Sequence, residues 1–404
     1  MVGSTPTRPT IQRKVKMKKG LFVLFVLSSV VLFSSISEWN SLNIDPLLTN
    51  DPYSYLTYSG SMIEADQFKT ITSFDYMNDK INALGMFDNY WGRLGIFIDR
   101  ESVDMRDSII KNIVGRDVVP TILGITGGRK VNNFGFGFLI SGYRMDEYLT
   151  DQTSPYNNTT LSFSNFNLNP SITVNINEIL SLDLSGGVSV LSLNSDDVNR
   201  VLKVNSPVGY NLHGRVTQSF SENKVILSAK YTNNPFGYEE LQQGDVSGDI
   251  YLNTADTLAV QVLLSIESFS YVSTYLSALY EQNAKTSKLT FVTGSQSEEI
   301  ISVAKLPEIA TGFSFYVNKF ISLNIGVSGC WFNSKIEKAP LLSPIQQTSG
   351  FESDFRTGII LSFDNLRIAF DMSKEIVNAP FIISGNSING LDMNVGISYT
   401  GYEF

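Results

Sequence analysis

The sequence predicts an all-β fold in which antiparallel strands close into a barrel, and three observations lead to it. Long runs of residues alternate between apolar and small polar side chains. Charged residues make up only 17% of the chain, whereas aromatic residues reach 12%. Short turns alternate with longer polar links between these runs. These features are typical of strands that present one face to lipid, so we expect a closed antiparallel transmembrane β-barrel of about 16 strands, within a range of about 14 to 18.

The clearest alternation begins after a tight turn at Asn318 and Lys319 and runs from residue 321 to residue 331. Its even positions are small or polar, and its odd positions are mostly apolar. Successive side chains of a strand point to opposite faces, so this period of two marks a strand with one apolar face. We expect the apolar row to face lipid, with its last residue near a membrane interface. The row consists of Ile321, Leu323, Ile325, Val327 and Trp331.

Composition limits the classes of function. The chain has 404 residues and a formal net charge of −9, and without its six cations before Glu38 it would carry 24 Lys and Arg against 39 Asp and Glu, a balance of −15. An acidic chain is not expected to bind nucleic acid. The single cysteine, Cys330, cannot form an internal disulfide, and the single histidine, His213, leaves no His/Cys metal site. We therefore expect no metal and no cofactor.

The N-terminus predicts a secretory signal over residues 1–37. A basic region that includes Lys18 and Lys19 precedes the apolar residues 20–33, and small residues follow at 35–37. Met17 also opens a complete signal and is a candidate true start. The alternative is a membrane-anchoring helix, but the apolar stretch is shorter than the roughly 20 residues that a span requires. We therefore expect export.

Behind the signal, residues 38–60 form an irregular segment that could fold inside a barrel lumen, and residues 61–404 form the barrel. Turn-forming residues separate the candidate strands. The expected strands lie at residues 64–76, 88–99, 118–126, 131–146, 158–177, 180–193, 204–220, 223–235, 245–253, 256–267, 269–282, 287–295, 307–318, 320–333, 355–364, 366–375 and 390–403. Their number is odd, whereas an even number is expected of a barrel, so one strand is miscounted.

The connections carry a second pattern. Short turns are expected at residues 177–179, 221–223, 318–319 and 364–365, and longer polar links at 147–157, 236–244, 296–306, 334–354 and 376–389. In outer-membrane barrels the short turns are periplasmic. Residues 100–114 look like a loop with a helical turn. The last strand ends in Tyr402 and Phe404, which resembles the signal that the barrel assembly machinery reads, with a bulge expected at Gly401.

Two stretches resemble the long-chain fatty acid transporter family of outer-membrane barrels. They are NPSITVNINEILSLDLSGGVSVL at residues 169–191 and FRTGIILSFDNLRIAFDM at residues 355–372, which match that family's hairpins. The family also has an N-terminal plug with an Asn-Pro-Ala element, where this chain has Asn-Ile-Asp-Pro at 43–46 and Asn-Asp-Pro at 50–52. The resemblance implies that hydrophobic molecules pass through a plugged barrel by a lateral or lumenal route.

Several polar residues on the predicted strands should line the lumen. Arg367 and Asp371 share one strand face, where they would act either as a selectivity lining or as a structural charge pair. The glycines of residues 132–142 alternate with phenylalanines and indicate a tightly curved strand. The predicted lumen lining consists of Asp183, Lys230, Asn324, Arg367 and Asp371.

The sequence favours a passive channel or transporter in the outer membrane of a diderm bacterium. Its solutes would be small, and hydrophobic molecules are one candidate class. Its expected partners are outer-membrane lipid, the barrel assembly machinery and a small-molecule solute. Three alternatives remain: a barrel without transport, a soluble secreted β-sandwich, and a lipid hydrolase. The hydrolase would use His213 with Arg215 and Ser219 on one strand face, but we favour the interpretation of His213 as a polar lumen or rim histidine. We expect no enzymatic activity.

Overall fold

The computed structural model describes residue 42 and residues 54–64, 69–75, 80–100, 121–150, 158–195, 200–206, 208–242, 249–269, 271–291, 296–339, 345–363, 366–373 and 393–400. The described strands all belong to one 18-stranded sheet, and two short helices precede them. The predicted signal segment 1–37 with Met17, the predicted helical turn after residue 100, and Tyr402 and Phe404 lie outside the described residues.

The elements follow one another in a simple order. They are α3 (Ser54–Thr57), the 3-10 helix η2 (Ser59–Glu64), β1 (Lys69–Asp75), β2 (Lys80–Asn89), β3 (Gly92–Arg100), β4 (Ile122–Val131), β5 (Phe134–Thr150), β6 (Asn158–Asn177), β7 (Leu180–Ser195), β8 (Arg200–Ser206), β9 (Val208–Phe220), β10 (Asn223–Asn233), β11 (Phe236–Gln242), β12 (Asp249–Phe269), β13 (Val272–Thr290), β14 (Gln296–Asn318), β15 (Ile321–Ala339), β16 (Gln346–Phe363), β17 (Leu366–Ser373) and β18 (Met393–Thr400).

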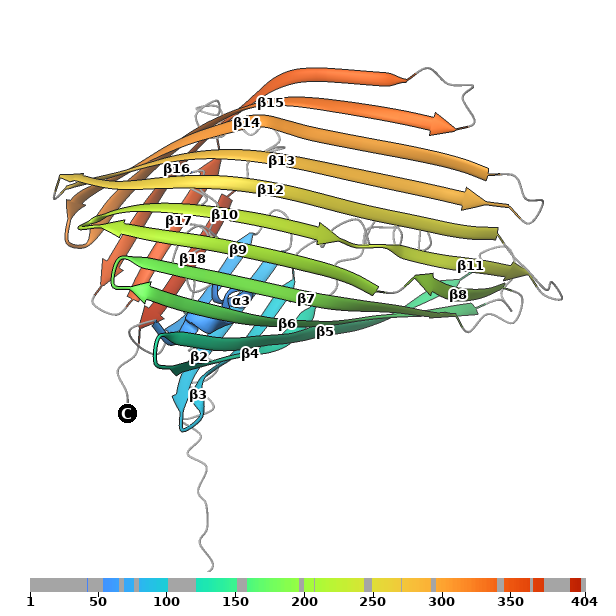
Figure 1. The fold of residues 1–404 in the computed structure, drawn as a ribbon, viewed down its shortest axis with the longest axis horizontal. Helices are drawn as coiled ribbons and strands as arrows, with labels where there is room; N and C mark the ends of the chain where they lie inside the picture. The colour runs from blue at the N-terminus through green and yellow to red at the C-terminus, as the bar shows by residue number, and fades with distance from the viewer. Residues whose placement is uncertain are drawn as a thin grey trace, which may run out of the picture.

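Strand pairing follows the chain. Each pairing in the described sheet is antiparallel, and nearly every strand pairs with its neighbours in sequence. The first strand, β1, pairs with β2 and also with the last strand, β18. Figure 1 shows the strands of this sheet curving around a common interior. The predicted all-β, antiparallel sheet is confirmed.

Strands β8 and β11 extend a hairpin. Only residue 207 separates β8 from β9, and only Asn234 and Pro235 separate β10 from β11. β9 pairs directly with β7 and β10, and β10 pairs with β12. β8 and β11 pair with each other and continue the ladder that β9 and β10 form. Proline has no N–H to donate to a neighbouring strand, so Pro235 interrupts the ladder. The four segments therefore form one long, interrupted hairpin.

The short turns gather at one end of the sheet. Two-residue connections join β2 to β3, β4 to β5, β6 to β7, β9 to β10, and β14 to β15. Three of them are shaped by an asparagine whose Oδ1 accepts hydrogen bonds from the backbone of the turn: Asn89 from Trp91 and Gly92, Asn177 from Ile179, and Asn318 from Phe320 and Ile321. Asparagine suits such turns because its side chain replaces a backbone acceptor. The predicted turns at 177–179 and 318–319 are confirmed.

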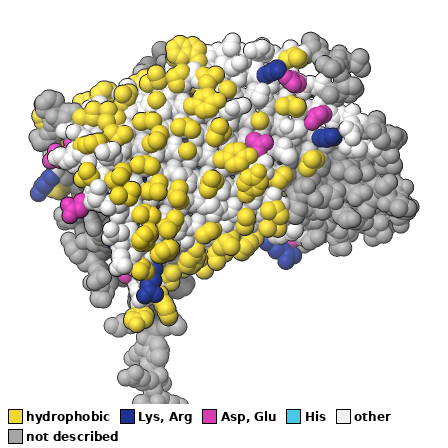
Figure 2. Space-filling model, in the orientation of Figure 1, with side chains coloured by type: hydrophobic (Ala, Val, Ile, Leu, Met, Phe, Trp, Pro, Cys, Tyr) yellow, Lys and Arg dark blue, Asp and Glu magenta, His cyan; other side chains and the backbone are white. Residues whose placement is uncertain are grey.

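The two faces of the sheet invert the pattern of a water-soluble core. Serine, threonine, asparagine and charged side chains are buried on the face that lines the interior, here called the inner face. Large apolar side chains are exposed on the opposite, outer face. Figure 2 shows hydrophobic side chains spread over the outer face in view, with charged side chains mostly near its edges. A contiguous apolar surface of this kind marks contact with lipid or with another protein.

Several predicted strand limits are wrong. The expected links at 236–244, 296–306 and 334–354 are mostly strand, because β11, β14, β15 and β16 continue through them. The expected strands 245–253 and 256–267 form one strand, β12, and the expected strand 287–295 is the end of β13. The missed parts of β11, β14, β15 and β16 mix polar and apolar side chains without regular alternation, while cross-strand backbone hydrogen bonds still hold them.

The expected strand 88–99 contains a turn. Tyr90 and Trp91 separate β2 from β3, and β2 begins at Lys80, which no predicted strand included. Aromatic residues favour strands, so propensity alone extends the strand through this dipeptide. The Asn89 side chain overrides that preference by capping the turn. Separately, no described helix has the length and apolarity to cross a membrane.

Candidate functional site

The N-terminal elements lie inside the curved sheet. Helix α3 appears within the ring of strands in Figure 1, and η2 contacts β3, β4, β5 and β6. Most of the described side chains of residues 54–62 are buried, including that of Tyr58, which links the two helices, and that of Met62 in η2. Residue Leu42 is buried against another part of the wall, where it packs with Ile226, Leu263 and Tyr275 of β10, β12 and β13. The described pieces of the N-terminal segment therefore contact two different parts of the inner face.

Alternating glycines make room for η2. A Cβ placed on Gly60 would lie 2.7 Å from the carbonyl oxygen of Gly135, and a Cβ on Gly135 or Gly137 would overlap the backbone of Gly60 or Ser59. A side chain at any of these positions would push the two backbones apart. The glycines of residues 132–142, predicted to allow tight curvature, therefore permit backbone-to-backbone contact between β5 and η2.

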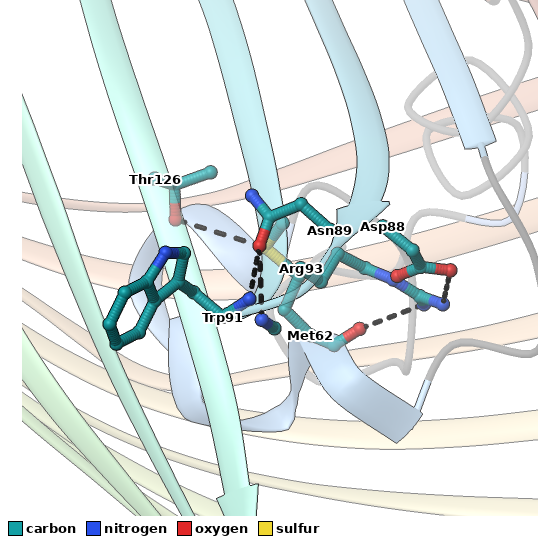
Figure 3. A network of polar contacts seen from close by, with 7 residues as sticks. Met62, Asp88, Asn89, Trp91, Arg93 and Thr126 are labelled. Carbon is teal, nitrogen blue, oxygen red and sulfur yellow. Dashed lines mark hydrogen bonds and ion pairs between the residues drawn. The ribbon is translucent and has the colours of Figure 1, made fainter.

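Polar groups fix η2 to the wall. The Oγ atoms of Ser59 and Ser171 are 2.8 Å apart, and the Gly60 N–H donates to Ser171 Oγ at 2.8 Å. Arg93 Nη1 donates to the carbonyl oxygen of Met62 at 3.1 Å. Figure 3 shows this contact beside the ion pair of Arg93 with Asp88, whose two hydrogen bonds measure 2.6 and 2.9 Å. Asp88 thus holds the guanidinium in place for the backbone of η2.

A second buried arginine contacts the N-terminal segment through a ring. Arg215 is only 1% exposed, and its guanidinium lies 4.5 Å from the centre of the Tyr58 ring. Its Nε and Nη2 both lie 2.8 Å from Asp183 Oδ2, and Thr173 Oγ1 donates to Asp183 Oδ1 at 2.6 Å. Buried charges persist only when they are paired and hydrogen-bonded. Asp183 and Thr173 meet that requirement, so the face of the Arg215 guanidinium remains available for a cation–π contact with the Tyr58 ring.

A cavity of about 500 Å³ lies beside Tyr58 on the inner face. Its lining includes His213, Lys230, Glu281 and Lys285 together with the apolar side chains of Leu279, Ile301 and Val303. A smaller cavity of about 190 Å³ is lined by Leu56 and Thr57 of α3, and His213 lines it as well. Open space therefore adjoins the N-terminal segment in two places, and the larger space has both charged and apolar walls.

The structure places all five predicted lumen residues on the inner face. Asp183 belongs to the Arg215 cluster, Lys230 lines the larger cavity, and Asn324 is fully buried on β15. Arg367 and Asp371 lie on the same face of β17. Asp371 forms an ion pair with Arg356 of β16, whose Nη1 lies 2.9 Å from Asp371 Oδ2.

The predicted lipid-facing row lies on the outer face. Leu323, Val327 and Trp331 are 39%, 43% and 59% exposed, and Ile321 and Ile325 are half-buried between neighbouring strands. The Trp331 ring packs against Phe351 of β16, with ring centroids 4.7 Å apart. At the other end of the row, Phe320 and Phe363 stack at 6.2 Å. Aromatic pairs therefore bound the apolar row at both ends.

The geometry does not suit the hydrolase alternative. His213 and Ser219 lie on one strand, β9, and are separated by six residues. Residues in a strand advance by about 3.3 Å each, so these two side chains are roughly 20 Å apart along β9. A base must lie within about 3 Å of the hydroxyl that it activates. Arg215, the third proposed member, is already bound to Asp183.

Sequence reasoning missed the contacts of the N-terminal segment. Residues Tyr58, Ser59 and Met62 carry no recognisable motif, and their partners come from strands far along the chain. One signal was available: Gly135 and Gly137 fall on the inner-face positions of β5, where glycine commonly marks a close backbone approach.

No protein-family model matches the sequence, and no curated protein matches it. Among solved structures, CdiB from Escherichia coli aligns with a TM-score of 0.47 and 9% identity over 83% of this chain and 63% of CdiB. The toluene transporter TodX from Pseudomonas putida aligns with a TM-score of 0.37 and 10% identity over 87% of this chain and 93% of TodX. The CymD monoaromatic hydrocarbon channel aligns with a TM-score of 0.40 and 11% identity over 93% of this chain and 98% of CymD.

This chain thus spans less than two thirds of CdiB. At such low TM-scores the likenesses are distant, and the fold described above stands on the strand pairings of this chain alone.

Proposed function

We propose that this protein is an outer-membrane β-barrel channel for small solutes and that its N-terminal segment plugs the lumen. The observation that carries the proposal is the burial of most side chains of residues 54–62 inside the ring of paired strands, beside a cavity of about 500 Å³. An apolar outer face bounded by aromatic pairs supports a membrane setting. The short-turn end would be periplasmic.

We propose a closed wall in which β8 with β9, and β10 with β11, each act as one strand. The pairings of β7 with β9 and of β10 with β12 support this reading, because they bypass β8 and β11. The wall then has about 16 strands, an even number as expected for a bacterial outer-membrane barrel.

Passage through this barrel would be passive and would require displacement of the plug. The cavity beside Tyr58 has apolar side chains next to charged ones, which suits a small solute with an apolar body. The cations Lys230 and Lys285 and the anion Glu281 would then filter by charge. The signal segment 1–37 would direct export.

Conductance in a planar bilayer tests the proposal. Deleting residues 38–64 should convert a mostly closed protein into one with discrete, long-lived conductance steps, because nothing else in the described interior crosses it. Heat-modifiable migration in detergent would verify that the deleted variant still forms a barrel. A folded, membrane-inserted variant without conductance would instead favour a barrel that does not transport.

A reversible lock sharpens this test. The Oγ atoms of Ser59 and Ser171 are 2.8 Å apart, so the double variant Ser59→Cys with Ser171→Cys brings two thiols together. Adding Cys330→Ser removes the only native thiol. The oxidised protein should stay closed, and reduction should restore the opening rate of the parent. The single variant Ser59→Cys is the matched control and should not respond to the reductant.

A further inference from the structure

One arginine interrupts the apolar outer face near the short-turn end. Arg129 is exposed on β4, in the outward row that also carries Leu123, Ile125 and Val131. On one side it faces Phe136 of β5 across the strand pair. No acidic side chain in the described part of the chain pairs with Arg129. Its charge therefore stands among apolar neighbours.

A charge in this place is costly unless something outside the chain meets it. Arginine on the lipid face of a barrel costs about 2–4 kcal/mol at the midplane and about 0–1 kcal/mol near an interface. Arg129 lies two residues from the end of β4, which sets it about 7 Å along the strand from the turn. Its guanidinium can therefore reach the depth of lipid headgroups.

An apolar groove of about 280 Å³ adjoins the arginine. Its floor is formed by Leu94 of β3 and Phe138 of β5, whose side chains come together over Gly127 because that residue has no side chain of its own. A Cβ at Gly127 would lie 2.8 Å from side-chain atoms of both neighbours, so even a methyl group would displace them. A hydrocarbon chain can lie in this groove with apolar atoms on both sides.

Trp91 closes the same groove at the turn. Its side chain is 70% exposed and lines the groove together with Arg129. Figure 3 shows Trp91 in the turn where its backbone N–H donates to Asn89 Oδ1 at 2.7 Å, which fixes the start of the side chain. Exposed tryptophans of membrane proteins place an apolar ring and one N–H at headgroup depth.

We propose that this groove binds one glycerophospholipid of the periplasmic leaflet. Arg129 would hold the phosphate through paired hydrogen bonds, Trp91 would lie against the glycerol region, and an acyl chain would lie along the groove on the apolar surface of Leu94 and Phe138. This lipid site rests on the proposed function in two respects only, namely that the protein lies in the outer membrane and that its short turns face the periplasm. It predicts a bound lipid whether or not the barrel conducts.

Native mass spectrometry of the full chain, titrated with phosphatidylglycerol after delipidation, tests the site. The wild type should bind one lipid with an affinity at least about ten-fold above that of Arg129→Gln, since hydrogen bonds to charged groups contribute about 1.5–3 kcal/mol. Gly127→Leu should weaken binding as well, because it fills the groove. Arg144→Gln is the matched control, because Arg144 is also an exposed, outward-facing arginine, at the opposite end of β5. It should bind like the wild type.

Three results would overturn the proposal. One is equal binding by the wild type and Arg129→Gln, and another is an equal loss in Arg144→Gln, which would indicate general charge attraction. The third is displacement of the lipid by inorganic phosphate at similar concentration, because the groove would then recognise phosphate without a chain. Heat-modifiable migration of each variant separates these failures from loss of the barrel itself, which would instead count against the proposed function.

Discussion

Truncating Tyr58 should release the N-terminal segment from the wall. The Tyr58 side chain is fully buried, and its ring lies against the Arg215 guanidinium. Truncation of a buried large aromatic residue costs about 3–5 kcal/mol, and a desolvated cation–π contact accounts for about 2 kcal/mol of such a loss. Tyr58 also lines the adjoining cavity of about 500 Å³, so its truncation enlarges a space that already exists. We therefore take the lower limit, about 3 kcal/mol, for Tyr58→Ala.

This loss should fall on the docked state alone, because the displaced segment no longer contacts Arg215. A change of about 3 kcal/mol raises the ratio of displaced to docked segment by roughly a hundred-fold. Single-channel recording would show it as a matching rise in the ratio of open to closed time. Tyr210→Ala is the control, since Tyr210 is an outer-face tyrosine that packs on Tyr231 and does not touch the segment. If Tyr58→Ala stays as closed as the wild type while deletion of residues 38–64 opens the channel, the assignment of docking energy to Tyr58 is wrong.

Three further predictions follow from the inner and outer faces. Gly135→Ala should displace η2 and increase opening, whereas Gly186→Ala should leave recordings unchanged, because a Cβ there would meet only ordinary contacts at 3.6 Å. Val327→Lys, near the middle of the apolar row, should lower the free energy of unfolding in lipid by about 2–4 kcal/mol, as measured by urea titration. The control is Ser349→Lys, at an exposed position of β16 beyond the row, which should change this free energy by less than about 0.5 kcal/mol. Asp183→Ala should destabilise the barrel by about 3–5 kcal/mol, because Arg215 is left buried without its carboxylate. Asp371→Ala should destabilise it less, because Arg356 keeps a second carboxylate, that of Asp354, at 3.0 Å. Equal losses of unfolding free energy in the same titration would contradict this prediction.

The outer face could be predicted from sequence because one rule governs it. A strand that presents one face to an apolar environment and the other to a polar interior alternates its side chains, so the row from Ile321 to Trp331 repeats with a period of two. The turns next to it were also predictable, since Asn177 and Asn318 shape them through contacts within three residues. Both kinds of information are local.

The strand limits beyond the apolar rows were not predictable in this way. From Gln296 to Lys305, neither face of β14 is apolar throughout, because charged residues stand on both faces beside Ile300, Ile301 and Val303, and its pairing with β13 and β15 holds it extended. Backbone hydrogen bonds between strands place no demand on side-chain polarity. The same reasoning explains why β12 was divided in two.

The inner face depends on a partner that lies far away in sequence. Ser171, Thr173, Asp183 and Arg215 read as ordinary small or charged lumen residues until Ser59 and Tyr58 are placed against them. Their polarity satisfies both water and a polar plug, so no alternation distinguishes a filled interior from an open one. Glycine does distinguish a filled interior from an open one. In a water-filled lumen no backbone comes so close to the wall that a Cβ would not fit, whereas Gly135 and Gly137 lie against the backbone of η2. Inner-face glycines at alternate positions of one strand therefore indicate which part of the wall a plug contacts.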